Sequence, residues 1–374
     1  MTDVPEISCF SKNYSDGMQR FRQAGAMSEA DMETRIHPHS LTPDGQPLEQ
    51  DIAWFGAKDA PKVLLVSAGT HGLEAFAGSA AMIHWMQSGH WRELPPDTAV
   101  CMVHTVNPFG WAHLSRFNEN FVDVNRNFID HSESYPPNPL YEEILALFET
   151  DSVSDDELVR GWFRFRDYLV NHNDPALVIQ CATGGQYQDP TGPSFGGHQY
   201  EWSTLSLIDL IDARLTQART VVHIDWHTGL GRFGQPAFVI GAHPDSPAFA
   251  LACTVWGRDA LTPDDLFEAN AGTPEYRGLI HSGLIEHLER SGVRATGTVI
   301  EFGTYANPTM NAALFIDRWL RQQCDSPDSE TARSARQTIL ERFNPSAIEW
   351  RSAVLSHSAA LMQRTLESIS TLHT

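Results

Sequence analysis

The chain has 374 residues, of which 41% are hydrophobic and 20% are charged, and its formal net charge is −21 at pH 7. This apolar content is enough for a substantial core and excludes a disordered chain, while the strong negative charge argues against nucleic acid as a partner. No apolar run reaches about 18 residues, and the first residues have no basic start followed by an apolar run. We therefore expect neither a membrane span nor a signal peptide.

The cysteines are odd in number, scattered along the chain, and form no pair of the CxxC type. This pattern favours neither a disulfide framework nor a thiolate zinc site, and it fits reduced thiols. A cytoplasmic location is therefore the expectation. The cysteines are Cys9, Cys101, Cys181, Cys253 and Cys324.

Short apolar runs rich in branched residues alternate along the chain with segments of helical spacing. The predicted strands are residues 62–68, 99–106, 220–225, 237–240 and 296–302. The predicted helices are residues 75–87, 140–149, 155–171, 203–217 and 276–291. Strands separated by helices predict an α/β fold, with a mainly parallel sheet flanked by helices on both faces. We expect one domain over residues 1–374, with a helical C-terminal segment at about 334–370 that serves packing or an oligomer contact.

Residues 181–203 are rich in glycine, proline, glutamine and tyrosine. A long loop of this kind inside a compact domain is usually functional or disordered, and its aromatic content favours an ordered loop near a site. It contains one GxSxG string at residues 192–196. No apolar strand precedes the string and no helix follows it directly, so we interpret it as a chance match and not as the nucleophile of a serine hydrolase.

Histidine and glutamate residues follow or end several predicted strands. His71 and Glu74 follow the first strand, and His227 follows the third. Ligands collect at the carboxyl ends of strands in α/β sheets, so these side chains are candidates for one site. Two histidines and one carboxylate form a common catalytic zinc set, which leaves a fourth position open and activates water near neutral pH. Taken singly, an HxxE pair on a helix surface or a buried core histidine stays an alternative.

Glu301 ends the fifth predicted strand, where an unpaired carboxylate is costly. It is a candidate general base, with a structural ion pair as the alternative. The polar segment 116–128 holds two arginines. Arg126, beside Asn125, would suit a substrate carboxylate, and Arg116 would suit a developing oxyanion. A polar loop that is braced by its own side chains is the alternative for this segment.

Four motifs occur in the order known from one protein family. They are His71-Gly72-Leu73-Glu74, Asn125-Arg126, the histidine of Asp225-Trp226-His227-Thr228-Gly229, and the glutamate of Glu301-Phe302-Gly303-Thr304. The chain therefore resembles the zinc carboxypeptidase superfamily, which includes the aspartoacylase and succinylglutamate desuccinylase branch. Residues 68–74, 185–187, 196–197 and 201–203 resemble most a bacterial branch of that superfamily known only as a domain of unknown function.

The resemblance implies a carboxypeptidase-like α/β fold with a mixed, mostly parallel sheet, one zinc ion, and hydrolysis of an amide bond. It implies that zinc is bound by His71, Glu74 and His227. It also implies that Glu301 is the general base and acid, and that a substrate carboxylate is bound by Asn125 and Arg126.

The resemblance assigns Arg116 less firmly, because its distance before the Asn-Arg pair varies between branches; its implied role is to polarise the scissile carbonyl. Carboxypeptidases also use a mobile tyrosine before the catalytic glutamate, and Tyr276 is the candidate here. A buried structural tyrosine is its alternative. His223 and His198 could suggest a second metal ion, but one ion suffices for this chemistry.

The function that follows is a zinc-dependent hydrolase that cleaves an amide bond of a small-molecule or peptide substrate with a free carboxylate. That substrate would be a peptide C-terminus or an N-acyl amino acid. An esterase or deacylase acting on a small carboxylate, and a non-catalytic metal- or ligand-binding protein on the same scaffold, are the alternatives. A homo-oligomer stays open.

Overall fold

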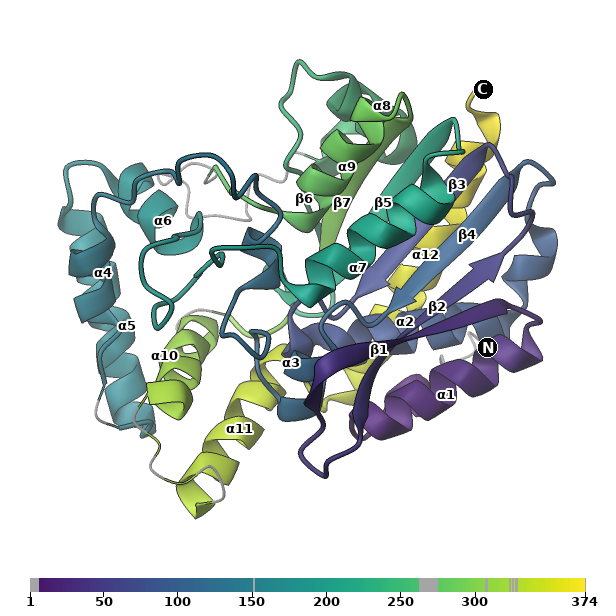
Figure 1. Cartoon of the computed structure of the whole chain (residues 1–374). Helices are drawn as coiled ribbons and strands as arrows, with labels where there is room; N and C mark the ends of the chain where they lie inside the picture. Colours follow the sequence, from purple (N-terminus) through teal and green to yellow (C-terminus); the bar gives the residue numbers. More distant parts are fainter. Residues whose placement is uncertain are drawn as a thin grey trace.

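The computed structural model describes residues 7–150, 152–261, 275–306, 309–322, 324, 326 and 329–373. In this part of the chain, seven strands form one sheet in the order β1-β2-β4-β3-β5-β7-β6 (Figure 1). The strands are β1 Asp31–Leu41, β2 Pro47–Phe55, β3 Lys62–Ala68, β4 Thr98–His104, β5 Thr220–Gly229, β6 Pro236–Val239 and β7 Arg294–Gly303.

The centre of the sheet is parallel and its edges are antiparallel. β3 pairs in parallel with both β4 and β5, and β5 pairs in parallel with β7. β1 and β2 form an antiparallel hairpin on one edge, and β6 lies antiparallel to β7 on the other. The prediction of an α/β fold with a mixed, mostly parallel sheet is confirmed.

Strand β3 explains why the central strands could be recognised from their apolar runs. Leu64 and Val66 belong to the core on one face of the sheet, and Val63 and Leu65 belong to the core on the other face. Because side chains alternate across a strand, a strand covered on both faces is apolar at nearly every position.

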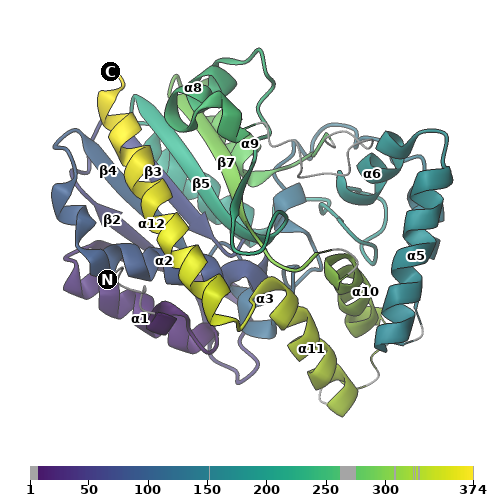
Figure 2. The ribbon, with the colours of Figure 1, turned by 180° about the vertical axis from the view of Figure 1, so that it is seen from behind.

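Helices cover both faces of the sheet, as Figures 1 and 2 show from opposite sides. Helices α1, α2 and α12 lie behind the sheet in Figure 1, and α7 and α9 lie in front of it. The helices are α1 Tyr14–Met27, α2 Ala75–Ser88, α3 Pro108–His113, α4 Tyr141–Leu147, α5 Asp155–Asn171, α6 Pro175–Thr183, α7 Trp202–Leu210, α8 Pro247–Trp256, α9 Ile280–Arg290, α10 Thr309–Gln322, α11 Glu330–Phe343 and α12 Ile348–Thr371.

The helical segment expected near the C-terminus corresponds to α11 and α12. Helix α12 packs along α2 and α8 and buries Trp350, Val354 and Leu355 completely. In this structure α12 therefore packs against other helices that cover the sheet. No helix in the described ranges is both long and apolar enough to cross a bilayer.

Helices α4, α5, α6 and α10 form a group beside the sheet, which we call the helical lobe (Figure 1). Its core includes Ile144, Phe165 and Phe315. Gly161 allows α5 to approach α10 closely, because a Cβ atom at this position would lie 2.8 Å from the ring of Phe315. The lobe therefore has its own apolar core, which joins the rest of the molecule near α11.

Several elements differ from the sequence-based expectations. The hairpin β1–β2 was not predicted, because β1 is an edge strand with mostly exposed, polar side chains and a register shift between Ile36 and Leu41. Helices α1, α3, α6, α8 and α10 were also missed. Helix α9 begins at Ile280, so Tyr276, which was predicted to begin this helix, lies in the segment before it.

Candidate metal centre and active site

The candidate residues converge at the carboxyl edge of the parallel strands. His227 lies in β5, which extends beyond the predicted end of that strand, and Glu301 lies in β7. The two residues are direct partners in the parallel register, so their side chains start from neighbouring positions on adjacent strands. His71 follows β3, the other neighbour of β5.

The turn between His71 and Glu74 brings both side chains to one point. Residues Gly72–Glu74 form a single 3-10 turn that leads directly into α2. A Cβ atom on Gly72 would lie 1.9 Å from the backbone of Gly110, so glycine is needed where this turn packs against α3. The HxxE motif thus lies on the turn that leads from β3 into α2.

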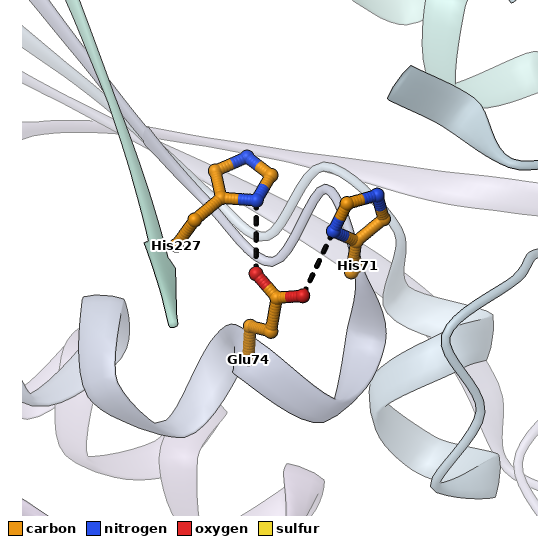
Figure 3. Close-up of side chains that lie close together, drawn as sticks. All are labelled: His71, Glu74 and His227. Carbon is orange, nitrogen blue, oxygen red and sulfur yellow. Dashed lines mark hydrogen bonds and ion pairs between the residues drawn. The ribbon is translucent and has the colours of Figure 1, made fainter. Parts of the chain in front are cut away.

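Figure 3 shows both imidazole rings turned toward the carboxylate of Glu74. His71 Nδ1 lies 2.9 Å from Glu74 Oε1, and His227 Nδ1 lies 2.8 Å from Glu74 Oε2. The three side chains are buried, and each offers a ligand atom within 4.8 Å of the other two. Within the described ranges this is the group of histidine and acidic side chains whose geometry suits a metal ion.

Two aspartates that the sequence analysis did not assign orient these histidines. His71 Nε2 lies 3.1 Å from Asp123 Oδ1, and His227 Nε2 lies 2.7 Å from Asp225 Oδ2. A carboxylate beside Nε2 favours the tautomer in which Nε2 carries the proton, which leaves the Nδ1 lone pair for a metal ion. A signal for Asp225 was present, because residues two apart on a strand point to the same face.

Asp225 is itself held by hydroxyl groups. Its Oδ1 accepts a hydrogen bond of 2.7 Å from Ser67, and its Oδ2 accepts one of 2.8 Å from Thr70. Ser67 Oγ is also 2.7 Å from His223 Nε2, so His223 donates to the hydroxyl that donates to Asp225. His223 thus supports the candidate ligand His227 through Ser67 and Asp225, and among the described residues it belongs to no group with metal-binding geometry. His198 is also outside such a group, since its Nε2 contacts the carbonyl of Tyr187.

The charges of the site attract a cation. Burial disfavours the charged form of His227, yet Asp225 and Glu74 outweigh it and raise the pKa of His227 well above its ordinary value. Burial would raise the pKa of Glu74, but the imidazoles of His71 and His227 lower it. The Nδ1 atoms of His71 and His227 each face an oxygen of Glu74, and two electron-rich atoms at such a distance repel each other unless a positive charge lies between them. One metal ion would supply that charge to all three side chains. The donor set therefore fits zinc, which takes nitrogen and carboxylate ligands in catalytic sites.

Glu301 does not belong to the group of three candidate ligands. Its Oε2 accepts a weak hydrogen bond from the backbone nitrogen of Leu230 at 3.3 Å. Burial, followed by the negative charge of Glu74, raises the pKa of Glu301 from 4.5 to about 7. A carboxyl group with such a pKa can both accept and return a proton near neutral pH.

Arg116 lies against the carboxylates of Glu74, a candidate metal ligand, and of Asp123, the partner of His71. It donates to Glu74 Oε1 at 3.2 Å and to Asp123 Oδ2 at 3.4 Å. Burial disfavours its charge, but Asp123 and Glu74 raise its pKa. The guanidinium has five donors in all, so an arginine with two long contacts retains capacity for a developing oxyanion.

Asn125 and Arg126 lie on a short 3-10 turn, Val124–Arg126. Arg126 donates from Nε and Nη2 to the carbonyl of Thr183, at 3.0 and 2.8 Å, which anchors the guanidinium to the end of α6. The Oδ1 of Asn125 accepts from the backbone nitrogen of Ile280, so its amide nitrogen is the end that can donate to a ligand. Tyr276 is half-buried, and its ring centre lies 4.8 Å from Arg126 Cζ.

All eight candidate residues line one cavity of about 930 Å³. The eight residues selected from the sequence therefore share one cavity, and their roles stay predictions. Ser194 of the GxSxG string also borders the cavity. It lies in the loop between α6 and α7 and donates only a long hydrogen bond of 3.4 Å to the carbonyl of Ala182, without the strand and helix of a nucleophile elbow.

A family model described as "Protein of unknown function (DUF2817)" matches residues 10–357. The chain belongs to this family. The match confirms the resemblance to a bacterial branch known as a domain of unknown function. No curated protein matches the chain significantly.

Three solved structures match most of the chain at low sequence identity. Carboxypeptidase A from Helicoverpa armigera is 12% identical, with a TM-score of 0.44, over 94% of this chain and 74% of that one. A metallo-carboxypeptidase from Burkholderia cenocepacia is 12% identical, with a TM-score of 0.47, over 97% and 72%. A succinylglutamate desuccinylase/aspartoacylase family protein from Shewanella amazonensis SB2B is 20% identical, with a TM-score of 0.35, over 76% and 70%.

Proposed function

We propose that this protein is a zinc-dependent hydrolase that cleaves an amide bond in a substrate with a free carboxylate. The observation that carries the proposal is the buried group of His71, Glu74 and His227, which shares one cavity with Glu301 and Arg126. A metal ion, a proton acceptor and a carboxylate-binding arginine are the three parts that such a reaction needs.

The residues would divide the work as follows. Zinc held by His71, Glu74 and His227 would supply Lewis acidity and lower the pKa of water. Glu301 would take a proton from the attacking water and return it to the leaving amine. Its raised pKa supports both halves of this transfer. Arg116 would stabilise the negative charge that develops on the scissile carbonyl oxygen.

The substrate would be oriented from its carboxylate. Arg126 donates to the carbonyls of Thr183 and Asn125, which fix its guanidinium. One N–H group on each of its two terminal nitrogens would remain for the substrate, without further reorganisation. Asn125 would add a donor, because its oxygen is already used by Ile280. Tyr276 stacks beside Arg126, and we assign it a contact to the same end of the substrate.

The test combines metal content with turnover. We expect one zinc per chain by mass spectrometry, and hydrolysis of N-acyl amino acids or short peptides that is lost with a chelator and restored by zinc. Matched ester and amide substrates with one acyl group separate a peptidase or amidohydrolase from an esterase. Stoichiometric zinc without turnover on either class would overturn the proposal and favour a binding protein.

A further inference from the structure

One wall of the cavity has no part in the chemistry described so far. It belongs to the helical lobe, and the lobe side chains that reach the cavity are large and apolar. They include Phe148, Trp162, Phe165, Leu169, Ile179 and Phe315.

The wall is one continuous surface. Trp162, Phe165 and Leu169 follow a spacing of three and four residues, so they lie on one face of α5. Phe148 stacks on Phe315 with ring centres 5.0 Å apart and contacts Phe165 at 5.8 Å. Other positions of α5 are exposed, whereas this face is buried and lines the cavity.

The wall begins beside the arginine that we assign to the substrate carboxylate. Arg126 is bonded to the carbonyl of Thr183, the last residue of α6, and Ala182 and Ile179 of the same helix line the cavity. The position of the guanidinium relative to the wall is thus fixed by two hydrogen bonds. A group attached near a carboxylate on Arg126 lies within reach of the lobe.

The wall has little to offer a polar group. Among the described residues of the lobe that line the cavity, Thr183 is polar and none is charged. Placing a charged group against such a surface is costly unless it is paired, whereas each methylene that is buried there is favourable. A volume of about 930 Å³ is also at the upper end for a small-molecule site, and is more than an acetyl amino acid requires.

We propose that the substrate carries, besides its carboxylate, an apolar alkyl or aryl group of several carbons, and that the helical lobe binds this group. The inference rests on the proposed function for the reaction, but it concerns binding. The group could be the acyl chain of an N-acyl amino acid or the side chain of its amino acid part. Both have the same chemistry, and substrates that vary one part at a time distinguish them.

The first experiment measures binding without turnover. Zinc-loaded protein is titrated calorimetrically with butanoate, hexanoate and octanoate, which share a carboxylate and differ only in apolar length. Burial of methylenes predicts that Kd falls by about fourfold for each one added, until the chamber is filled. Values of Kd that stay within about twofold from butanoate to octanoate would overturn the inference.

The second experiment locates the group in the lobe. Ile179→Asn makes the wall polar at a half-buried position, which limits the risk to folding. Val170→Asn is the matched control, since Val170 is 56% exposed on α5 and is outside the cavity lining. We expect the first variant to weaken octanoate by about tenfold and butanoate much less, and the control to leave both unchanged. Full length dependence in Ile179→Asn would contradict binding by the lobe.

The third experiment uses hydrolysis and separates this inference from the proposed function. Specificity constants are compared for acetyl to octanoyl chains on alanine, and for acetylated alanine, norleucine and phenylalanine. A rise along either series supports the inference and identifies which part enters the lobe. Hydrolysis without any length dependence would overturn the inference alone, whereas length-dependent binding without hydrolysis would overturn the proposed function alone.

Discussion

The carboxyl edge of the sheet and the helical lobe face each other across one cavity, but they are built from opposite kinds of residues. The sheet edge buries His71, Glu74 and His227 together with the carboxylates that orient them. The lobe contributes aromatic and aliphatic side chains with no charge among its described lining residues. Buried charge is tolerated only when it is paired or functional, so we assign the proposed chemistry to the sheet edge and only the binding of an apolar group to the lobe.

Because the two regions differ in this way, substitutions in them should have different effects. A substitution at the sheet edge should alter metal binding or the rate constant of the reaction, while a substitution in the lobe should alter stability or substrate choice. The largest expected effects therefore come from the sheet edge.

Glu301→Gln should give the largest effect on the reaction. The neutral amide cannot accept a proton, so we expect kcat to fall by about 10²- to 10⁴-fold. Zinc content should be unchanged, because Glu301 is not among the three ligands. Steady-state kinetics and metal analysis check both parts.

The matched control for this prediction is Glu286→Gln, at an exposed position on α9, which should keep the parent rate constant. Loss of zinc from Glu301→Gln would mean that this residue is a ligand and that the division of roles is wrong. Retention of most of the activity would remove Glu301 from the mechanism.

Asp225→Asn tests the support of the ligand shell. The contact of 2.7 Å to His227 Nε2 fixes the tautomer, so its loss should weaken zinc affinity by about 10- to 100-fold. Competition with a chelating dye gives the affinity. Asp245→Asn is the control, since this side chain is 93% exposed and does not belong to the candidate metal group. Equal zinc affinity in both variants would show that Asp225 only stabilises the fold.

The two aspartates show what could and could not be predicted from the sequence. His71, Glu74, His227 and Glu301 stand in motifs at the ends of apolar runs, so their convergence could be expected. The contact between His71 and Asp123 depends on how a loop after α3 folds back, which no local pattern describes.

The same difference applies to the fold. Strand β3 could be predicted because both of its faces are covered, so its sequence is apolar from Val63 to Val66. Strand β1 has charged and polar residues on an edge, so it lacked any alternation that would mark it. The lobe's α5 was predicted as a helix, but that its Trp162 and Phe165 face the metal cavity follows from packing against α10, which sequence spacing does not determine.

Arg126→Ala sharpens the comparison at the border of the two regions. A charge-assisted hydrogen bond of about 1.5–3 kcal/mol corresponds to a loss of about 10- to 100-fold in kcat/KM for substrates with a free carboxylate. Substrates whose carboxylate is blocked as an amide should lose far less. Equal losses for both would mean that Arg126 acts through its anchor on Thr183 and not through the substrate.

The pH dependence of kcat/KM should be set by Glu301 on its acid side. The base must be deprotonated, so activity falls as the pH drops below the pKa of Glu301, by about tenfold per pH unit. Burial and Glu74 raise this pKa to about 7, and a bound cation would lower it again. We therefore expect the acid limb of the zinc enzyme between pH 4.5 and 7, and its absence in Glu301→Gln. An unchanged acid limb in that variant would assign the titration to another group.

The smallest effect on the chemistry should come from the core of the lobe. Phe148→Leu removes the stack on Phe315 and part of the buried apolar area. Since both contributions are lost, we expect the free energy of unfolding to fall by about 1–2 kcal/mol. Phe163→Leu, at a 46% exposed position on α5, should change it by less than about 0.5 kcal/mol. Denaturant unfolding gives both values, and zinc content should be the same in both. Loss of zinc from Phe148→Leu would mean that the lobe and the sheet edge form one cooperative unit. Leu73 would connect them, because it lies between His71 and Glu74 in the sequence and packs into the lobe's core.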